Sequence, residues 1–145
     1  MKKQQSISPL RITDNGNERD IHEACEKLKE YNLSHREASA NVPIGVFLED
    51  ESGGKLAGLT GETFGSWLCI RFLFVSEPLR GQGIGSRLLE NAEKEARRRG
   101  CKYAFMDTFS VQAPEFYKKQ GYQEVFALEE YPYTGQRHYC TKELL

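Results

Sequence analysis

The chain has 145 residues, of which 39% are hydrophobic and 28% charged, and its formal net charge is −1. This length and composition predict a single globular domain spanning residues 1–145. The balanced charge argues against a nucleic-acid partner, which would favour a basic excess, and no apolar run is long enough to cross a membrane. No apolar signal core follows the lysines at the start of the chain, so we expect a cytoplasmic protein.

The cysteines and histidines do not form a metal-binding pattern. Cys25, Cys69, Cys101 and Cys140 lack C-x-x-C spacing, and none of the three histidines clusters with them. We therefore expect no metal site. Cys69 and Cys101 lie in apolar segments, where a free cysteine behaves as a small hydrophobic residue, and we expect all four to be reduced and structural.

The first half of the chain predicts a strand, a helical region and an antiparallel meander. Residues 9–17 are typical of a short first strand followed by turn residues. Residues 18–37 carry apolar side chains at helical spacing. A strand over 41–50, a turn at 51–54 and a returning strand over 55–64 then predict a hairpin.

The segment 67–76 differs because it is apolar almost throughout. This pattern predicts a central strand covered on both faces, with Arg71 as the one exception. The helix that follows the glycine loop carries an apolar stripe made of Ile84, Leu88, Leu89, Ala92 and Ala96. Its other face carries three pairs at i,i+4 spacing that favour ion pairing: Glu90–Lys94, Glu93–Arg97 and Glu95–Arg99.

The remaining segments complete one crossover and a closing hairpin. A strand over 101–109 lies parallel to the strand over 67–76, because a helix connects them. Residues 113–122 predict a short helix that ends at Gly121, and 122–131 and 136–144 predict two closing strands. The fold class is therefore α+β, with a mixed central sheet of six to seven strands, one parallel β-α-β crossover and about four helices.

Three glycines, Gly81, Gly83 and Gly85, stand between the central strand and its helix. The free N–H groups at a helix N-terminus bind anions, and glycines let a phosphate approach the main chain. The loop lacks the lysine and the spacing of a P-loop. It also lacks the G-x-G-x-x-G spacing and the repeated βαβ units of a dinucleotide-binding fold. The pattern thus favours a phosphate ligand of another kind.

The segment RGQGIG fits the pattern [QR]-x-x-G-x-[GA] at the end of a central strand. Together with the helix that follows and the downstream APEFYKKQGY, it resembles the GNAT superfamily of N-acetyltransferases over residues 67–126. The resemblance implies a GNAT-like domain whose two central parallel strands splay apart, with acetyl-CoA as acetyl donor. The implied coenzyme-binding residues are Phe74, Val75, Arg80, Gly81, Gln82, Gly83, Ile84, Gly85, Ser86, Ser110, Ala113 and Tyr117.

The resemblance also implies roles within that set. The diphosphate lies on the glycine loop, and the pantetheine arm bonds to main chain near Phe74 and Val75. Many relatives carry asparagine where this chain has Ser110, which is shorter, so that contact is open and Gln112 is an alternative. The match at Ala113 is intact.

Acetyl transfer to an amine needs a neutral amine, a stabilised thioester oxygen and a proton for the leaving thiolate. The resemblance gives the last role to the Tyr117 hydroxyl, although a tyrosine packed in the core is the structural alternative. An N–H near Val75 is the expected partner of the thioester oxygen. The identity of the general base is open. The candidates are Glu62 and Asp107 at strand ends, three side chains of the closing hairpin, and a chain of waters. The hairpin candidates are Glu129, Glu130 and His138.

The predicted function is an N-acetyltransferase that uses acetyl-CoA and acts on a small-molecule amine by direct transfer in a ternary complex. Two alternatives stay open: an acetyltransferase acting on a protein N-terminus or lysine, and an acyl-CoA-binding sensor without turnover. Tyr31, His35, Tyr131, Tyr133 and His138 suit a polar amine pocket. Surface aromatics also suit a homodimer contact, and the sequence does not choose between the two.

Overall fold

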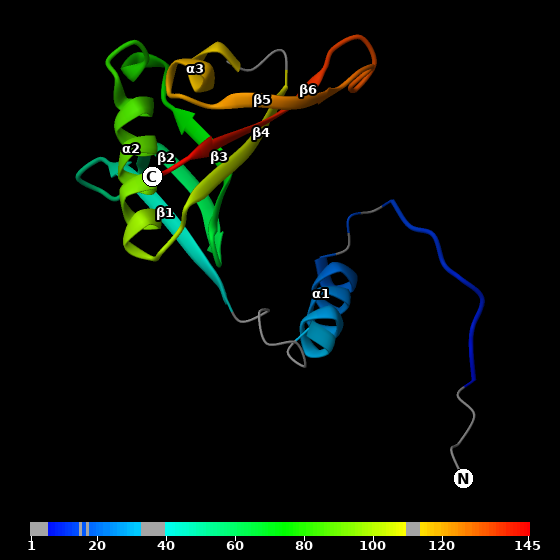
Figure 1. The fold of residues 1–145 in the computed structure, drawn as a ribbon. Coiled ribbons are helices and arrows are strands. Elements are labelled where there is room, and N and C mark those ends of the chain that lie inside the picture. Colours follow the sequence, from blue (N-terminus) through cyan, green and yellow to red (C-terminus); the bar gives the residue numbers. More distant parts are fainter. Residues whose placement is uncertain (1–5, 15, 17, 33–39, 110–113) are drawn as a thin grey trace. The chain divides into compact units, whose positions relative to one another are not determined.

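The computed structural model describes residues 6–14, 16, 18–32, 40–109 and 114–145. The chain divides into two compact units, residues 1–39 and 40–145. The first unit contains helix α1 (Glu18–Asn32; Figure 1), which has no buried residue. None of its described residues forms a strand, so the strand predicted for residues 9–17 is wrong there. A strand needs a neighbour for its backbone groups, and no described strand pairs with this segment.

The cysteines differ between the two units. Cys69, Cys101 and Cys140 are buried, and burial raises the pKa of each thiol. Cys25 lies on α1 and is exposed, so the prediction of four structural cysteines is wrong at this position. The helical spacing placed Cys25 on the apolar stripe of α1, and this whole stripe is exposed, including Ile21 and Leu28.

The second unit is built on one mixed sheet with the strand order β1-β2-β3-β4-β6-β5 (Figure 1). The strands are β1 (Asn41–Glu49), β2 (Lys55–Phe64), β3 (Trp67–Val75), β4 (Tyr103–Phe109), β5 (Gln123–Leu128) and β6 (Arg137–Glu143). Its helices are α2 (Ile84–Arg98) and α3 (Pro114–Lys119), and a 3-10 turn, η2 (Glu77–Leu79), follows β3. Among the strands of the described residues, only β3 and β4 pair in parallel, which confirms the α+β class and the single crossover. The described residues hold three α-helices rather than four, and no described helix has the length and hydropathy to span a bilayer.

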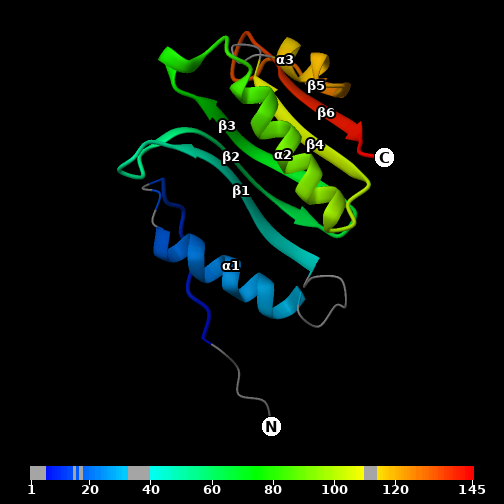
Figure 2. The same ribbon diagram turned by 90° about the vertical axis from the view of Figure 1, so that its left-hand side faces the viewer.

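Helix α2 lies along one face of the sheet (Figure 2). Its predicted stripe is confirmed, because Leu88, Leu89, Ala92 and Ala96 are buried and Ile84 packs against them. Glu93 is also buried, at 3% exposure. The predicted pairing of Glu93 with Arg97 on a solvent face is therefore wrong.

Glu93 instead joins α2 to the far end of the chain. Its carboxylate accepts hydrogen bonds from the Lys142 ammonium at 2.8 Å and the Tyr122 hydroxyl at 2.9 Å. Arg97 turns away and donates from Nε to the main-chain carbonyl of Leu144. A buried charge requires such a partner, and the partner here is 49 residues away in sequence.

The parallel ladder between β3 and β4 is short. It runs from Trp67 with Tyr103 to Ile70 with Met106, although β3 continues to Val75 and β4 to Phe109. Beyond Ile70 the two strands have no ladder between them, which confirms the predicted splay. The prediction that β3 is covered on both faces is wrong for its second half, because Phe72 is 74% exposed.

A β-bulge in β3 lies where the splay begins. Ile70 pairs with Gly61 of β2 and Phe72 pairs with Thr60, so Arg71 is the extra residue. A Cβ added at Gly61 would lie 2.0 Å from the carbonyl oxygen of Cys69, closer than any real contact. Gly61 thus permits the close backbone approach that the bulge requires.

We expect Gly61→Ala to lower the free energy of unfolding by about 3 kcal/mol, because the main chain of β2 or β3 must move to admit the methyl group. Urea unfolding measures the loss. Gly45→Ala on β1 is the matched control, since its Cβ would meet only the ring of Phe47, a side chain that can move. Equal stability of the two variants would contradict a bulge held by Gly61.

Candidate active site

The glycine loop uses its glycines for two physical reasons. Gly81 and Gly83 have φ angles of +81° and +77°, in the left-handed region that glycine adopts without strain. Nothing lies within 4 Å of a Cβ built on either residue, so their surfaces are open. Gly85 is different, because its Cβ would lie 3.3 Å from the ring of Phe116. The third glycine therefore allows α3 to pack closely against the start of α2.

The N-terminus of α2 is uncapped. Gly83 is the N-cap residue and has no side chain that could cap the helix, and the first turn of α2 contains no acidic residue. The first N–H groups of α2 and the positive end of its dipole therefore face out of the loop, which is the arrangement that binds phosphate.

Arg80 precedes this helix start. Its Nε donates to the carbonyl oxygen of Val75 at 3.1 Å, which ties the guanidinium to the end of β3. The loop thereby joins the splayed strand to the anion-binding end of α2.

A cleft of about 1150 Å³ runs from the loop into the splay. It brings together most of the predicted site residues, which are Phe74, Val75, Arg80, Gly81, Gly83, Ile84, Gly85, Ser86, Asp107 and Tyr117. Gln82 and Glu62 are not part of its wall, and Ser110, Gln112 and Ala113 lie outside the described residues. The wall also contains Arg71, Phe72, Leu73, Leu79, Thr108 and Phe116, which sequence reasoning did not assign to the site.

Tyr117 projects from α3 into the apolar core beside this cleft. Its ring meets those of Phe116 and Tyr122 edge-on, at 5.0 and 5.9 Å between centroids. Burial raises the pKa of the Tyr117 hydroxyl to about 12, and no described residue forms a hydrogen bond with it. The group thus stays protonated at neutral pH.

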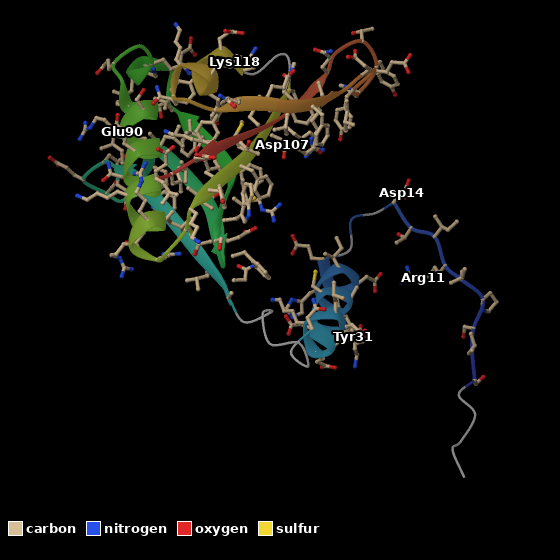
Figure 3. The ribbon with its side chains drawn as sticks, viewed as in Figure 1. Arg11, Asp14, Tyr31, Glu90, Asp107 and Lys118 are labelled. Carbon is tan, nitrogen blue, oxygen red and sulfur yellow. The ribbon has the colours of Figure 1, made fainter. Side chains whose placement is uncertain are left out.

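The two carboxylates predicted as bases are each bound to an arginine. Glu62 Oε1 accepts from Arg71 Nε at 3.0 Å, and Asp107 Oδ1 accepts from Arg137 Nε at 2.9 Å. Asp107 lies on β4 near its carboxyl end (Figure 3) and lines the cleft.

Two of the three hairpin candidates are engaged elsewhere, and the third, Glu130, is exposed. His138 contacts Glu124 through Nδ1, and Glu129 accepts a hydrogen bond from Gln136. Asp107 is therefore the predicted base candidate that lines the cleft.

Side chains from both faces of the sheet line the cleft. Side chains alternate along a strand, and Met106 packs into the core beneath α2, so Asp107 faces the opposite side. The glycine loop and Tyr117 belong to the α2 side. The glycine loop and Asp107 therefore line the cleft from opposite faces of the sheet.

Among the described residues, no group of three or more histidine, cysteine or carboxylate side chains lies close enough to hold a metal ion.

Comparison with known proteins places the chain among acetyltransferases. The acetyltransferase (GNAT) family matches residues 12–122. An acetyltransferase of Agrobacterium fabrum is 36% identical over 103 residues, which cover 71% of this chain and 75% of that protein. The blasticidin-S acetyltransferase of Streptomyces morookaense is 38% identical over 95 residues, which cover 65% of this chain and 70% of that protein.

A solved structure shows the same fold. The crystal structure of an acetyltransferase from Bacillus cereus superposes with a TM-score of 0.73 at 33% identity, covering 92% of this chain and 97% of that one. The resemblance carried by the glycine loop and the short helix around Tyr117 is thus confirmed. Because the family match extends over well more than half of its length, the chain belongs to the acetyltransferase (GNAT) family and is an acyltransferase.

Proposed function

We propose that this protein transfers the acetyl group of acetyl-CoA to the amine of a small molecule, directly and in a ternary complex. The observation that carries this proposal is the uncapped N-terminus of α2, which opens onto a cleft lined by both Tyr117 and Asp107. A phosphate-binding end, a proton donor and a carboxylate are thereby combined in one cleft. We further propose that residues 1–145 form one acetyltransferase domain, since the family match extends across both units.

The loop fits the diphosphate of the donor. Gly81 and Gly83 leave their surfaces open, and the N–H groups of the first turn of α2 face a ligand placed there. The gap-facing edge of β3 has no ladder with β4 after Ile70, so its main-chain groups are available to a pantetheine arm. These features support the residues of the loop and of β3 as the coenzyme-binding set.

In the proposed reaction the amine nitrogen bonds to the thioester carbon as the carbon–sulfur bond breaks. Main-chain N–H groups of β3 that face the gap donate to the thioester oxygen. Tyr117 donates its hydroxyl proton to the leaving sulfur, and the same burial that raises the pKa of Tyr117 also favours protonation of a thiolate beside it. Asp107 takes the proton that the amine loses, directly or through water, so the protons balance.

The size of the acceptor is supported by a relative. The blasticidin-S acetyltransferase is named for a small-molecule substrate and covers 65% of this chain. A sensor without turnover is less well supported, because a protein that only binds the coenzyme has no need for a free hydroxyl at its sulfur.

A screen of amines with acetyl-CoA tests the proposal, with release of free coenzyme A thiol as the measured quantity. We expect release with at least one class of small amine, and no release when the amine is omitted. Tight binding of coenzyme A by calorimetry, together with no release for any small amine, would support a sensor and overturn the proposed activity.

A further inference from the structure

Two side chains of opposite charge stand at the mouth of the gap between β3 and β4. The last pair of the parallel ladder is Ile70 with Met106, so Arg71 and Asp107 are the next residues of the two strands. Both line the cleft. Asp107 faces away from α2. Arg71 reaches Glu62, and the next residue along β2, Thr63, is buried and accepts a hydrogen bond from Arg99 of the α2 segment, so Glu62 faces away from α2. Arg71 and Asp107 therefore share the face opposite the glycine loop, which the proposed donor site leaves to the acceptor.

Each of these side chains is held by one partner and keeps one polar group open. Arg71 donates from Nε and Nη2 to the same oxygen of Glu62, at 3.0 and 2.5 Å, and no described residue accepts from its Nη1. Asp107 uses Oδ1 to accept from Arg137, and no described residue donates to its Oδ2. The ion pairs thus orient an unused donor and an unused acceptor on either side of the mouth.

The four charges of these two ion pairs sum to zero: Glu62 and Asp107 are negative, and Arg71 and Arg137 are positive. A ligand with a net charge would leave that charge uncompensated when the cleft encloses it, which costs free energy. A ligand that carries one positive and one negative group leaves no such net charge uncompensated. Phe72, 74% exposed beside Arg71 in the same wall, adds an apolar surface.

We propose that Arg71 recognises a carboxylate on the acceptor, so that the acceptor is an amino-acid-like zwitterion with its amine toward Asp107. The inference rests on the proposed acetyl transfer and deepens it by naming the class of acceptor. The carboxylate bonds to Arg71 Nη1 while Glu62 continues to hold the other side of the guanidinium. The ammonium lies near Asp107 Oδ2, which is also the carboxylate that takes its proton. Arg71 is thus a specificity-determining residue.

Matched acceptors test this assignment. The probes are the twenty common L-amino acids, their carboxamides, and the amines that lack the carboxyl group, each assayed for thiol release from acetyl-CoA. We expect the best amino acid to exceed its own amide and its decarboxylated amine by at least about tenfold in kcat/KM, because a hydrogen bond to a charged group discriminates by that much.

Variants of Arg71 separate recognition from catalysis. Arg71→Gln lowers kcat/KM for the amino acid by about 10- to 100-fold and lowers it for the amide by less than about threefold, which removes the preference. Arg71→Lys keeps the positive charge, so it lowers kcat/KM for the amino acid by less than Arg71→Gln does. The matched control is Arg98→Gln, which removes an equal charge from a guanidinium that is 71% exposed at the far end of α2 and leaves the preference intact.

A binding readout accompanies the kinetics. Calorimetric titration of the preferred amino acid into protein saturated with coenzyme A gives the acceptor affinity without turnover, and Arg71→Gln weakens it by the same factor. Turnover of amines that lack a carboxylate, with none for any amino acid, would overturn the zwitterion while leaving acetyl transfer standing. If no amine of any class supported thiol release, both proposals would be overturned.

Discussion

Gly83→Asp is expected to weaken coenzyme A binding by at least about 100-fold while the protein stays folded. The substituted carboxylate would stand at the N-cap of α2, in the space where we propose that the diphosphate binds. A negative charge about 5 Å from one phosphate costs on the order of 3 kcal/mol at an effective dielectric constant of about 20. That repulsion corresponds to about a 100-fold change in Kd, and the second phosphate adds to it. Isothermal titration with coenzyme A measures the effect.

The fold should tolerate this change. Nothing lies within 4 Å of the new Cβ, and aspartate is among the residues that adopt a positive φ most readily. An acidic N-cap also stabilises a helix, because it satisfies its first N–H groups and suits the helix dipole. We therefore expect a melting temperature within a few degrees of that of the unmodified protein.

Gly83→Asn is the matched control, since it has the same shape and backbone demands without the charge. We expect it to retain coenzyme A affinity to within about tenfold. If Gly83→Asp bound the coenzyme as tightly as the unmodified protein, the diphosphate would lie elsewhere and the proposed donor site would be wrong. If both variants lost binding equally, the backbone rather than the charge would be responsible.

Local patterns predict most elements of residues 40–145. The hairpin of β1 and β2, the amphipathic helix α2 and the glycine stop at Gly121 each have a signal within a few residues of the feature itself. The glycine loop, which we propose binds the diphosphate, is predictable for the same reason. Its N–H groups and glycines belong to one continuous segment, so a short stretch of sequence contains all the residues that define the loop.

Features that depend on distant partners are not predictable in this way. An apolar strand has the same sequence whether helices cover it or a ligand cleft runs along it, so the exposure of Phe72 had no signal. The burial of Glu93 depends on Lys142, and its spacing to Arg97 gave the wrong partner. The bulge opposite Gly61 likewise depends on the pairing of two strands.

Arg71 is a position where the sequence shows an unusual residue but does not explain it. It is the one charge in the apolar segment 67–76, which indicates a local exception to burial. The position of Arg71 in the fold can be understood only from the pairing of β3 with β4. Their ladder ends at Ile70, which places Arg71 at the mouth of the splay. Sequence could thus identify the unusual residue, and the strand pairing supplies the reason.

Tyr117→Phe is expected to lower kcat by about 100-fold or more and to change the KM for acetyl-CoA little. Loss of a positioned general acid costs this much, whereas the ring that packs against Phe116 and Tyr122 is retained. Thiol-release kinetics at saturating amine measure kcat. The control is Tyr103→Phe at the amino end of β4, which removes a hydroxyl outside the cleft wall and should leave kcat unchanged.

The pH dependence provides an independent test of the same residue. An ordinary tyrosine has a pKa near 10 and would lose its proton, and its activity as an acid, as the pH rises through that value. Burial raises the pKa of Tyr117 to about 12, so its proton is retained up to about pH 11. The rate deficit of Tyr117→Phe should therefore be constant from pH 7 to pH 10. A deficit that shrinks as the pH approaches 10 would mean that the hydroxyl titrates as in water, and a variant with full kcat would remove Tyr117 from the reaction, leaving only its packing role.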